Sequence, residues 1–375
     1  MEISKVELFP IRIPVESEQL SFGRVDTMHF VIVRLEDVSG AEGWGEAAIL
    51  QGPYWSSESQ ESVYYTIERY LSPRIIGREI RTTSEVIPLM QSVRGNPFAK
   101  AAVEMAMLDV EGKILHRSAA SMLGGRRRES LLVSWTLASN DTVRDCSKAE
   151  EMISRGWKIL KVKVGSLPVD EEVSRVQRIY EVTRGRAGLR IDANQGWSMK
   201  QALQAFEKLD RIGLDFIEQP LRRGDFAGLA ELSSTYSTPI MADESAETPD
   251  DVSLIALDGC AGIISYKLEK SGGFTNSLEM ERIAFDNGLE GYMGCMIETG
   301  IGNAAYAAFA SCVRKLSYGT ELFGPLRLSD DIAASGLTYS KGELQLSESP
   351  GLGITVDMDR LLKHTCRGWP KTTVG

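Results

Sequence analysis

The order of apolar and polar residues changes character near residue 125. Before that point, Ile3–Val15 and Met28–Leu35 alternate β-branched or other apolar residues with polar ones, which predicts half-buried strands. A turn near Asp37–Gly43 separates the second strand from Trp44–Ala48, and the apolar side chains of Ala99–His116 recur at helical spacing. The first part of the chain is therefore expected to be a mixed α+β segment.

From Leu131 onward, short apolar segments alternate with amphipathic stretches such as Val169–Thr183, Ser198–Leu209 and Thr275–Asn287. Eight strands that alternate with helices at near-constant spacing indicate a parallel barrel rather than an open sheet. The predicted barrel strands are Leu131–Leu137, Ile159–Val164, Leu189–Ile191, Asp215–Ile217, Pro239–Met241, Gly262–Tyr266, Leu289–Gly294 and Gly319–Leu322.

The last part of the chain contains one more strand-like segment, Glu343–Leu346, followed by a turn-rich stretch over residues 349–353. We expect this part to leave the barrel and pack back on the N-terminal region. The predicted fold is therefore of the α/β class: a (β/α)7β TIM-type barrel over residues 126–327, with an α+β capping domain over residues 1–125 that the C-terminal segment 328–375 completes.

Composition narrows the class of protein without changing this fold. The 375 residues are 25% charged and 43% hydrophobic, as in an ordinary globular protein, and the formal net charge is −10. An acidic chain without a basic face is not expected to bind nucleic acid, and the short run Arg126–Arg128 is interpreted as a solvated loop. No apolar run approaches the roughly 18 residues of a membrane span, so we expect no membrane partner.

The cysteines and the N-terminus indicate a reducing compartment. Five cysteines are scattered without CxxC spacing, which predicts free thiols rather than a disulfide framework or a zinc site. The first residues lack the apolar core of a signal peptide, and a cytoplasmic location is therefore expected.

Acidic residues follow three successive predicted strands. Asp192 ends the third, Glu218 the fourth and Asp243 the fifth. One such residue is commonly a helix N-cap or a turn residue, but three on neighbouring strands would converge at one rim of the barrel. Three carboxylates repel one another unless a cation neutralises them, and an all-oxygen set suits Mg²⁺ or Mn²⁺ rather than zinc. The sequence therefore predicts a divalent-metal site.

Lysines occupy the second and sixth predicted strands. Lys161 and Lys163 are two residues apart and share one face of a strand, which points either to solvent or into the barrel mouth. If the second and sixth strands lie opposite one another, Lys267 faces this pair across the barrel. Such an arrangement suits proton transfer on either face of a carbon next to a carboxylate, with a metal stabilising the enediolate. Cys295 is interpreted as a packed thiol rather than a nucleophile.

These residues, in this order, resemble the enolase superfamily and specifically its muconate-lactonising-enzyme subgroup. The likeness extends over nearly the whole chain. The segments that carry it besides the lysines and acids are Gly43-Trp44-Gly45-Glu46, Gly95-Asn96-Pro97-Phe98-Ala99-Lys100-Ala101, Leu123-Gly124-Gly125, Gly272-Gly273 and Pro350-Gly351-Leu352-Gly353.

The resemblance implies a role for each matched residue. Asp192, Glu218 and Asp243 would hold Mg²⁺ or Mn²⁺, and Lys163 and Lys267 would be the acid–base pair. Lys161 would lower the proton affinity of Lys163 and contact the substrate carboxylate, while Glu321 would shape the electrostatics near Lys267. Loops near Leu20–Thr27 and Gln51–Trp55 would close over the substrate. The remaining expected substrate contacts are Arg24, Trp55, Asn194 and Glu298.

Within the subgroup, the closest likeness is to cycloisomerases that interconvert a muconate-like dicarboxylate and its lactone. It rests on Val133–Ser139 and Gly319–Leu326. The segment Gly294–Thr299 is closer to dipeptide epimerases, but those usually carry two aspartates where this chain has Glu321 and Phe323. A racemase or epimerase of an N-acylamino acid and a dehydratase stay open as alternatives, as does a binding protein without activity. The family likeness also implies a homo-oligomer.

Overall fold

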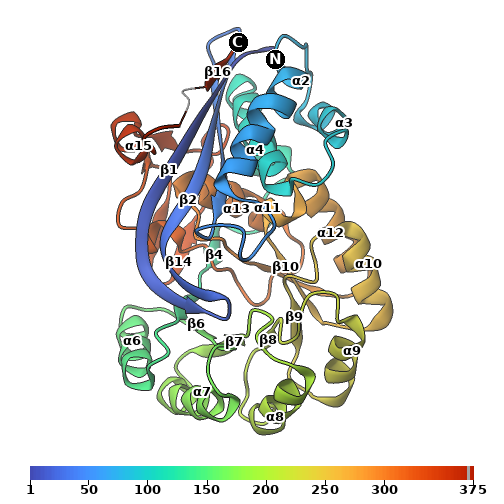
Figure 1. Cartoon of the computed structure of the whole chain (residues 1–375), viewed down its shortest axis with the longest axis vertical. Coiled ribbons are helices and arrows are strands. Elements are labelled where there is room, and N and C mark those ends of the chain that lie inside the picture. Colours follow the sequence, from blue (N-terminus) through green and yellow to red (C-terminus); the bar gives the residue numbers. More distant parts are fainter. Residues whose placement is uncertain (370–371) are drawn as a thin grey trace.

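An antiparallel sheet of four strands and a parallel sheet of seven strands organise the computed structural model, which describes residues 1–369 and 372–375. Figure 1 shows the antiparallel sheet with its helices above the parallel sheet, whose outer side is covered by a series of helices. Two residues of the predicted C-terminal segment, 370 and 371, lie outside the described residues.

The N-terminal elements are β1 (Ile3–Leu20), β2 (Gly23–Asp37), β3 (Glu42–Ile49), α1 (Gln60–Thr66), the π-helix η1 (Ile67–Leu71), α2 (Ser72–Ile75), the 3-10 helix η2 (Thr83–Glu85), α3 (Val86–Gln91), α4 (Pro97–Ile114) and α5 (Ala119–Met122).

The barrel elements are β4 (Ser130–Leu132), β5 (Trp135–Leu137), α6 (Thr142–Ser154), β6 (Ile159–Lys163), α7 (Val169–Thr183), β7 (Gly188–Asp192), α8 (Met199–Leu209), β8 (Ile217–Glu218), α9 (Phe226–Thr235), β9 (Ile240–Ala242), α10 (Pro249–Asp258), β10 (Ile263–Tyr266), α11 (Leu268–Ser271), α12 (Phe274–Asp286), β11 (Glu290–Met293), α13 (Gly300–Cys312) and α14 (Gly324–Arg327). The C-terminal elements are β12 (Ala333–Ser335), β13 (Thr338–Ser340), β14 (Glu343–Gln345), β15 (Thr355–Val356), α15 (Met358–His364) and β16 (Thr372–Val374).

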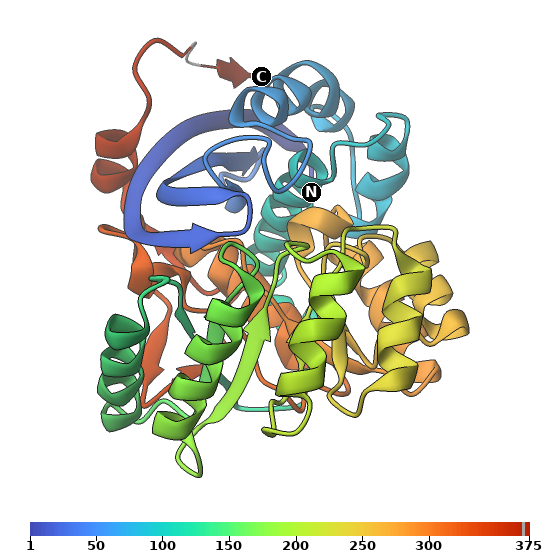
Figure 2. The ribbon, with the colours of Figure 1, turned by 60° about the horizontal axis from the view of Figure 1, so that its bottom comes forward.

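The long hairpin of β1 and β2 carries the capping sheet to the barrel. Its strands alternate buried and exposed residues, as the sequence pattern predicts, and they pair up to Leu20 and Gly23. At the tip, the amide of Gln19 donates to the carbonyl of Ala138, which follows β5, at 3.0 Å. Figure 2 shows the curved hairpin lying above the barrel strands. The tip of the hairpin therefore lies at the barrel mouth.

Helix α4 packs against the capping sheet at very short distance, which explains two glycines of the Gly43-Trp44-Gly45-Glu46 segment. A Cβ at Gly43 would lie 2.1 Å from the carbonyl oxygen of Ala106, and one at Gly45 would lie 2.0 Å from that of Ala102. Any larger residue would push the helix away from β3. The close packing lets α4, which is buried along most of its length, fill the space between the capping sheet and the barrel.

The parallel sheet has the strand order β11-β10-β9-β8-β7-β6-β5, so the strands follow the order of the chain. Thr320 closes the ring, since it forms parallel bridges both to Met293 at the end of β11 and to Val133 just before β5. The predicted eighth strand, Gly319–Leu322, is thus reduced to this one bridging position. The structure confirms the predicted barrel, and it places β6 and β10 on opposite sides of the ring, separated by β7, β8 and β9.

The C-terminal segment returns to the capping sheet only in part. Strand β16 pairs with β1, as expected of a segment that packs back on the N-terminal region. Strand β14, however, pairs with β4 and β13, so the predicted strand at Glu343–Leu346 stays beside the barrel. The reason is its register with β4, in which Leu344 lies opposite Leu131 and both side chains are buried.

The run Arg126–Arg128 is not the solvated loop that we expected. The guanidinium of Arg128 is half-buried and donates to the carbonyls of Ala310 at 2.6 Å and Val313 at 2.8 Å. These carbonyls lie at the C-terminal end of α13, where backbone acceptors lack helical partners and a cation is favourable. Arg128 therefore caps a barrel helix. Within the described residues, no helix is both long and apolar enough to cross a membrane.

Candidate active site

Five consecutive barrel strands bring charged side chains to the same end of the barrel. Lys163, Asp192 and Glu218 are the last residues of β6, β7 and β8, and Asp243 and Lys267 directly follow β9 and β10. Because the carboxyl ends of parallel strands meet at one rim, these side chains gather there. The structure thus brings together the residues predicted to be metal ligands and the predicted acid–base pair.

Lys161 lies deeper in the barrel, on the inner face of β6, with a side chain that is 1% exposed. Its Nζ donates to Oε2 of Glu218 at 2.7 Å and also to the carboxylate of Glu321, and it lies 3.6 Å from Oδ2 of Asp192. Burial alone would lower the pKa of Lys161, but Glu218 and Glu321 outweigh burial and hold the pKa well above its usual value. Lys161 is therefore a permanent cation under the site, and the inward orientation of the pair is confirmed.

Lys163 lies at the rim. Its Nζ donates to Oδ2 of Asp192 at 2.6 Å and to Oδ1 of Asn194 at 3.1 Å. Burial lowers its pKa, Asp192 raises it and Lys161 lowers it, and the net result is a pKa above the usual lysine value. The predicted effect of Lys161 on Lys163 is thus present, but the carboxylate of Asp192 outweighs it in this structure.

Lys267 shares the carboxylate of Asp243 with a second lysine. Nζ of Lys267 lies 2.7 Å from Oδ2, and Nζ of Lys270 donates to Oδ1 and to the backbone carbonyl of Asp243, each at 2.7 Å. Burial alone would raise the pKa of Asp243, but the two ammonium groups outweigh it and lower the pKa. The pKa of Lys267 is raised despite its burial, chiefly by Asp243.

The three predicted metal ligands have the donor chemistry of a site for a hard divalent cation. All are buried carboxylates, and burial together with repulsion from Asp192 raises the pKa of Glu218 to about 8. Oε1 of Glu218 is buried without a hydrogen-bond partner among the described residues. A bound cation would offset the repulsion between the carboxylates, and it would give Oε1 of Glu218 the partner that it lacks.

In the structure, lysine ammonium groups are hydrogen-bonded to all three of these carboxylates. Asp192, Glu218 and Asp243 each have a lysine Nζ within 2.7 Å. In the part of the chain that the structure describes, no group of three or more His, Cys, Asp and Glu side chains is arranged to hold a metal ion. The three carboxylates fit a divalent cation in their donor chemistry, but in this arrangement lysines hold them, and these lysine contacts would have to change for a cation to bind.

Lys163 and Lys267 line one small cavity between the capping domain and the barrel mouth. Its volume is about 30 Å³, enough for only a few water molecules. Glu18, Thr136 and Glu321 are the acidic and hydroxyl groups in its wall. The rest of the wall is mostly apolar and comes from both capping loops and from the barrel: Leu20, Phe22, Leu50, Met296, Ile297 and Phe323.

Of the four residues expected to contact substrate, Trp55 and Asn194 line this cavity. Arg24 does not line it; its side chain is 65% exposed at the hairpin tip, and its Nε lies 3.8 Å from Oδ2 of Asp26. Glu298 is fully buried behind the wall, where its Oε1 accepts from the amide of Met296 at 2.5 Å. Burial raises the pKa of Glu298 to about 8.

Glu321 and Cys295 also line the cavity. Glu321 was expected to shape the electrostatics near Lys267, and it lines the same cavity as that lysine; its carboxylate pairs with Lys161 and lies 3.2 Å from Oγ1 of Thr136. Burial and the neighbouring Glu321 raise the pKa of Cys295 well above its usual value, so the thiol stays protonated. This agrees with its interpretation as a packed thiol.

Two residues in contact with the predicted set were missed by the sequence analysis. Lys270 follows Lys267 by three positions, a spacing that returns to the same side of a helical turn. Glu244 directly follows Asp243, is 2% exposed, and accepts from Nε1 of Trp55 at 3.0 Å. Burial raises the pKa of Glu244 to about 7. The helical spacing could have identified Lys270, but no sequence pattern pointed to Glu244.

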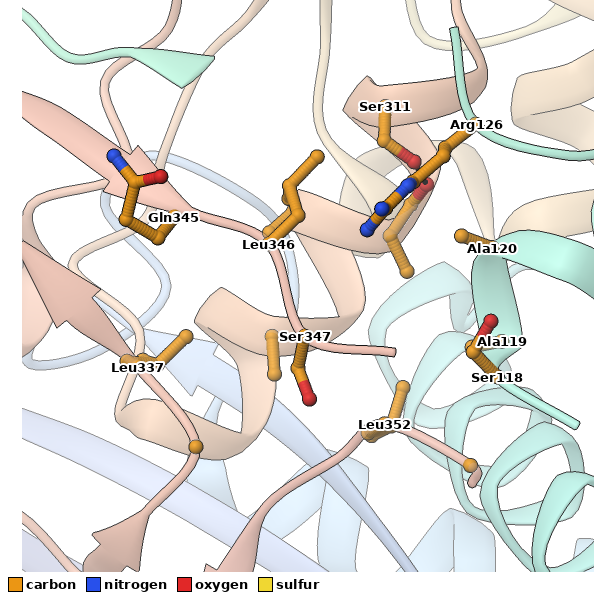
Figure 3. A pocket seen from close by; sticks show the side chains of 15 residues that line it. Ser118, Ala119, Ala120, Arg126, Ser311, Leu337, Gln345, Leu346, Ser347 and Leu352 are labelled. Atoms are coloured by element: carbon orange, nitrogen blue, oxygen red, sulfur yellow. Dashed lines mark hydrogen bonds between the residues drawn. The ribbon is translucent and has the colours of Figure 1, made fainter. Parts of the chain in front are cut away.

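A second cavity of about 30 Å³ lies away from the lysines, between α5, α13 and the C-terminal segment. Figure 3 shows Arg126, Ser311, Leu346 and Leu352 around it. Arg126 is engaged by Glu129 and Glu348, and the wall contains none of the lysines or carboxylates described above. The candidate active site is therefore the cavity at the barrel mouth.

Two family models match nearly all of the chain. Residues 4–124 match the "Mandelate racemase / muconate lactonizing enzyme, N-terminal domain", and residues 145–360 match "Enolase C-terminal domain-like". The first range covers the capping elements β1 to α5, and the second runs from α6 of the barrel to α15 of the C-terminal segment.

Curated relatives and solved structures agree with these models. The chain is 37% identical to muconate cycloisomerase 1 of Pseudomonas putida, over 93% of this chain and 94% of the relative. It is 34% identical to the chloromuconate cycloisomerase of Cupriavidus pinatubonensis, over 91% and 92%. Muconate lactonizing enzyme from Pseudomonas fluorescens, in a crystal structure with muconolactone, superposes with a TM-score of 0.95 at 37% identity, covering 97% and 99% of the two chains.

The fold and the site define a barrel enzyme in which two lysines line one small cavity beside buried carboxylates. The chain belongs to the mandelate racemase/muconate lactonizing enzyme family of the enolase superfamily. Enzymes of this superfamily depend on a metal ion.

Proposed function

We propose that this protein is a cycloisomerase that interconverts a muconate-like dicarboxylate and its lactone. One observation carries the proposal: Lys163 and Lys267 line the same small, largely apolar cavity at the mouth of the barrel. The relatives named muconate and chloromuconate cycloisomerases, at 33–37% identity over most of the chain, support this choice of reaction.

Asp192, Glu218 and Asp243 would hold Mg²⁺, or Mn²⁺ in its place. These carboxylates are buried and carry only oxygen donors, which both ions prefer. When bound, the ion would offset the negative charge that develops on the substrate carboxylate. Lys161, already paired with Glu218 and Glu321, keeps a positive charge below the same place.

Lys163 would act as the general acid of lactonisation. One carboxylate oxygen of the substrate adds to the conjugated double bond, and the electron pair moves toward the other carboxylate. A C–H bond then forms at the carbon next to that carboxylate, with the proton from Nζ of Lys163. In the reverse direction, the same amine removes this proton. Lys267, on the opposite side of the ring, would contribute mainly its charge.

The apolar wall would keep water away from the reacting carbon. Leu20, Phe22 and Leu50 come from the capping loops, while Ile297 and Phe323 come from the barrel. A six-carbon dicarboxylate is larger than a cavity of about 30 Å³, so the capping loops would have to move to admit it. Closure would then exclude water and strengthen the electrostatic interactions inside.

A racemase or epimerase of an N-acylamino acid is the second candidate, because its reaction needs a base on each face of the carbon and both lysines line the cavity. The dehydratase alternative requires the same groups. A free substrate ammonium, as in a dipeptide, would meet Phe323 in the wall, where a second carboxylate is absent.

The experiment is to incubate the purified protein with Mg²⁺ and cis,cis-muconate and follow the ultraviolet absorbance of the conjugated diene. A cycloisomerase removes this absorbance as the lactone forms. A parallel panel of N-acylamino acids in deuterated water tests the alternative. Inert muconates together with exchange and inversion at an α-carbon would reject the cycloisomerase and support the racemase.

We also propose a substrate class, a cellular location and an oligomeric state for the enzyme. A small-molecule carboxylate is the expected substrate, a cytoplasmic location follows from the free thiols, and the family likeness suggests a homo-oligomer. Analytical ultracentrifugation of the purified chain tests the last point, because a single species of monomer mass would contradict it.

A further inference from the structure

Each capping loop is linked to one of the two predicted catalytic lysines, and the barrel residues Asn194 and Glu244 join the two links. We call Ser21, Trp55, Asn194 and Glu244 the closure network. Ser21 and Trp55 belong to the capping domain, on the tip of the β1–β2 hairpin and on the loop after β3, while Asn194 and Glu244 follow the barrel strands β7 and β9.

The hairpin tip is linked to Lys163 through Asn194. Oγ of Ser21 donates to the backbone carbonyl of Asn194 at 2.6 Å, and Oδ1 of Asn194 accepts from Nζ of Lys163 at 3.1 Å. Asn194 has a φ of 39°, a left-handed conformation that costs energy for a residue with a side chain. The bond from Ser21 therefore helps to hold Asn194 in the conformation that aims its amide at Lys163.

The second loop is linked to Lys267 through Trp55. Nε1 of Trp55 donates to Oε1 of Glu244 at 3.0 Å, which fixes the orientation of the indole ring. Nζ of Lys267 lies 4.3 Å from the centre of that ring, within the range of a cation–π interaction. The ring and Asp243 therefore confine the ammonium group from different sides.

Glu244 joins the two links. The same Oε1 that accepts from Trp55 also accepts from Nδ2 of Asn194 at 3.2 Å. Glu244 is 2% exposed, and its Oε2 has no hydrogen-bond partner among the described residues. A buried carboxylate with one unpartnered oxygen is costly. Its bonds from Trp55 and Asn194 offset part of this cost.

We propose that Asn194 and Glu244 are positioning residues that couple closure of both capping loops to the placement of Lys163 and Lys267. This inference rests on the proposed function and extends it. When both loops are closed, Asn194 and the ring of Trp55 hold the two ammonium groups at the cavity. When the hairpin tip moves away from the barrel, Lys163 loses a restraint, and when the loop after β3 moves away, Lys267 loses one. Proton transfer is thereby tied to the state in which water is excluded.

Three substitutions test the coupling. Trp55→Phe keeps an aromatic ring near Lys267 but removes the N–H that bonds to Glu244. Ser21→Ala removes the hydroxyl that holds Asn194, and Glu244→Gln removes the charge of the acceptor. Tyr54→Phe is the matched control, since Tyr54 neighbours Trp55 on the same loop but is 69% exposed.

Steady-state kinetics on muconate with Mg²⁺ separate positioning from substrate binding. Trp55→Phe and Ser21→Ala should each lower kcat about tenfold with little change in KM, an effect of the size expected when one hydrogen bond that positions the site is lost. The double variant should lose less than the product of the single effects, because both act through Glu244 and Asn194. A rise in KM at unchanged kcat, or fully multiplicative effects, would overturn the proposal.

Hydrogen–deuterium exchange gives a readout that does not require turnover. Glu244→Gln should raise amide exchange in both capping loops, residues 19–24 and 50–56, although only the second contacts Glu244 directly. Faster exchange in the second loop alone would show that the loops are not coupled and would overturn the proposal. If the unmodified enzyme leaves muconate unchanged, the proposed function fails, and the exchange data alone decide on the coupling.

Discussion

Lys161 and Glu218 form an ion pair on the floor of the barrel, with Nζ 2.7 Å from Oε2 and each side chain 1% exposed. The carboxylate of Glu321 binds the same ammonium group from another side. A buried charge is tolerated only when it is paired, so this lysine balances acids that would otherwise repel one another. Lys161 therefore has a structural role that is independent of any contact with substrate.

Replacing Lys161 should destabilise the protein. Lys161→Met leaves Glu218 and Glu321 buried without their cation, and loss of one partner from a buried pair costs about 3–5 kcal/mol. The free energy of unfolding in urea, measured without metal, should fall by that amount. Lys158→Met, at an exposed position just before β6, should change it by less than about 0.5 kcal/mol. Equal stability of the two variants would show that the buried pairing contributes little.

Removal of a predicted metal ligand should weaken metal binding and lower activity. Asp192→Asn removes one of the three charges that would attract Mg²⁺, and isothermal titration calorimetry should show binding weakened by about 10-fold or more. Chelation of the metal should stop turnover of the unmodified enzyme, and added Mg²⁺ should restore it. Asp170→Asn, on the exposed start of α7, serves as the control. Unchanged affinity in Asp192→Asn would show that the metal-site assignment is wrong.

The sequence predicted the charged rim of the barrel well because charge at the ends of apolar strands is unusual. Strand periodicity placed Lys163, Asp192 and Lys267 at one end of the barrel, and the structure brings them there. The barrel itself was predictable from the alternation of strands and helices. The eighth strand was not, because a single bridging residue, Thr320, closes the ring without a regular segment.

What the sequence could not predict is the direction of side chains on loops and the partners of buried acids. Arg24 was expected at the substrate, but at a hairpin tip the turn geometry aims the side chain, and it faces solvent. Glu321 was expected to act on Lys267 and does line the same cavity, but its direct partner is the buried ammonium group of Lys161, which no sequence pattern indicated. Glu244 escaped notice because its role depends on Trp55, which is distant in sequence.

The two lysines should differ in their effect on lactonisation. Lys163→Ala should lower kcat by about 100-fold to 10,000-fold, the usual contribution of a general acid, because the amine that supplies the proton is gone. Lys267→Ala should lower it less, since that residue contributes charge rather than the proton. Diene absorbance gives both rates. Equal losses in the two variants would favour a two-base reaction such as racemisation.

Stability should fall with rising pH through ionisation of Glu104 in α4. Its Oε1 accepts from the amide of Thr275 at 3.0 Å and from Oγ1 of Thr275 at 2.6 Å, and burial raises its pKa from 4.5 to about 7. Between pH 4.5 and about pH 7, Glu104 holds its proton in the folded state but has lost it in the unfolded state. The associated stability is thus present at low pH and is lost as pH rises to about 7, by about 3 kcal/mol in all.

Glu104→Gln isolates this contribution, because an amide does not ionise. The difference in unfolding free energy between the unmodified protein and this variant should shift in favour of the variant as pH rises from 5 to 8. Urea unfolding at four pH values measures it. A difference that stays constant with pH would mean that Glu104 does not titrate in this range.

The central claim is that Lys163 delivers a proton to an enolate formed from muconate in the cavity at the barrel mouth. The most direct measurement is NMR of the product formed from cis,cis-muconate in deuterated water with Mg²⁺. We predict a lactone with one deuterium at the carbon next to the carboxylate, formed by the unmodified enzyme and lost in Lys163→Ala. Muconate that stays unchanged, while an N-acylamino acid gains deuterium with inversion, would contradict the account.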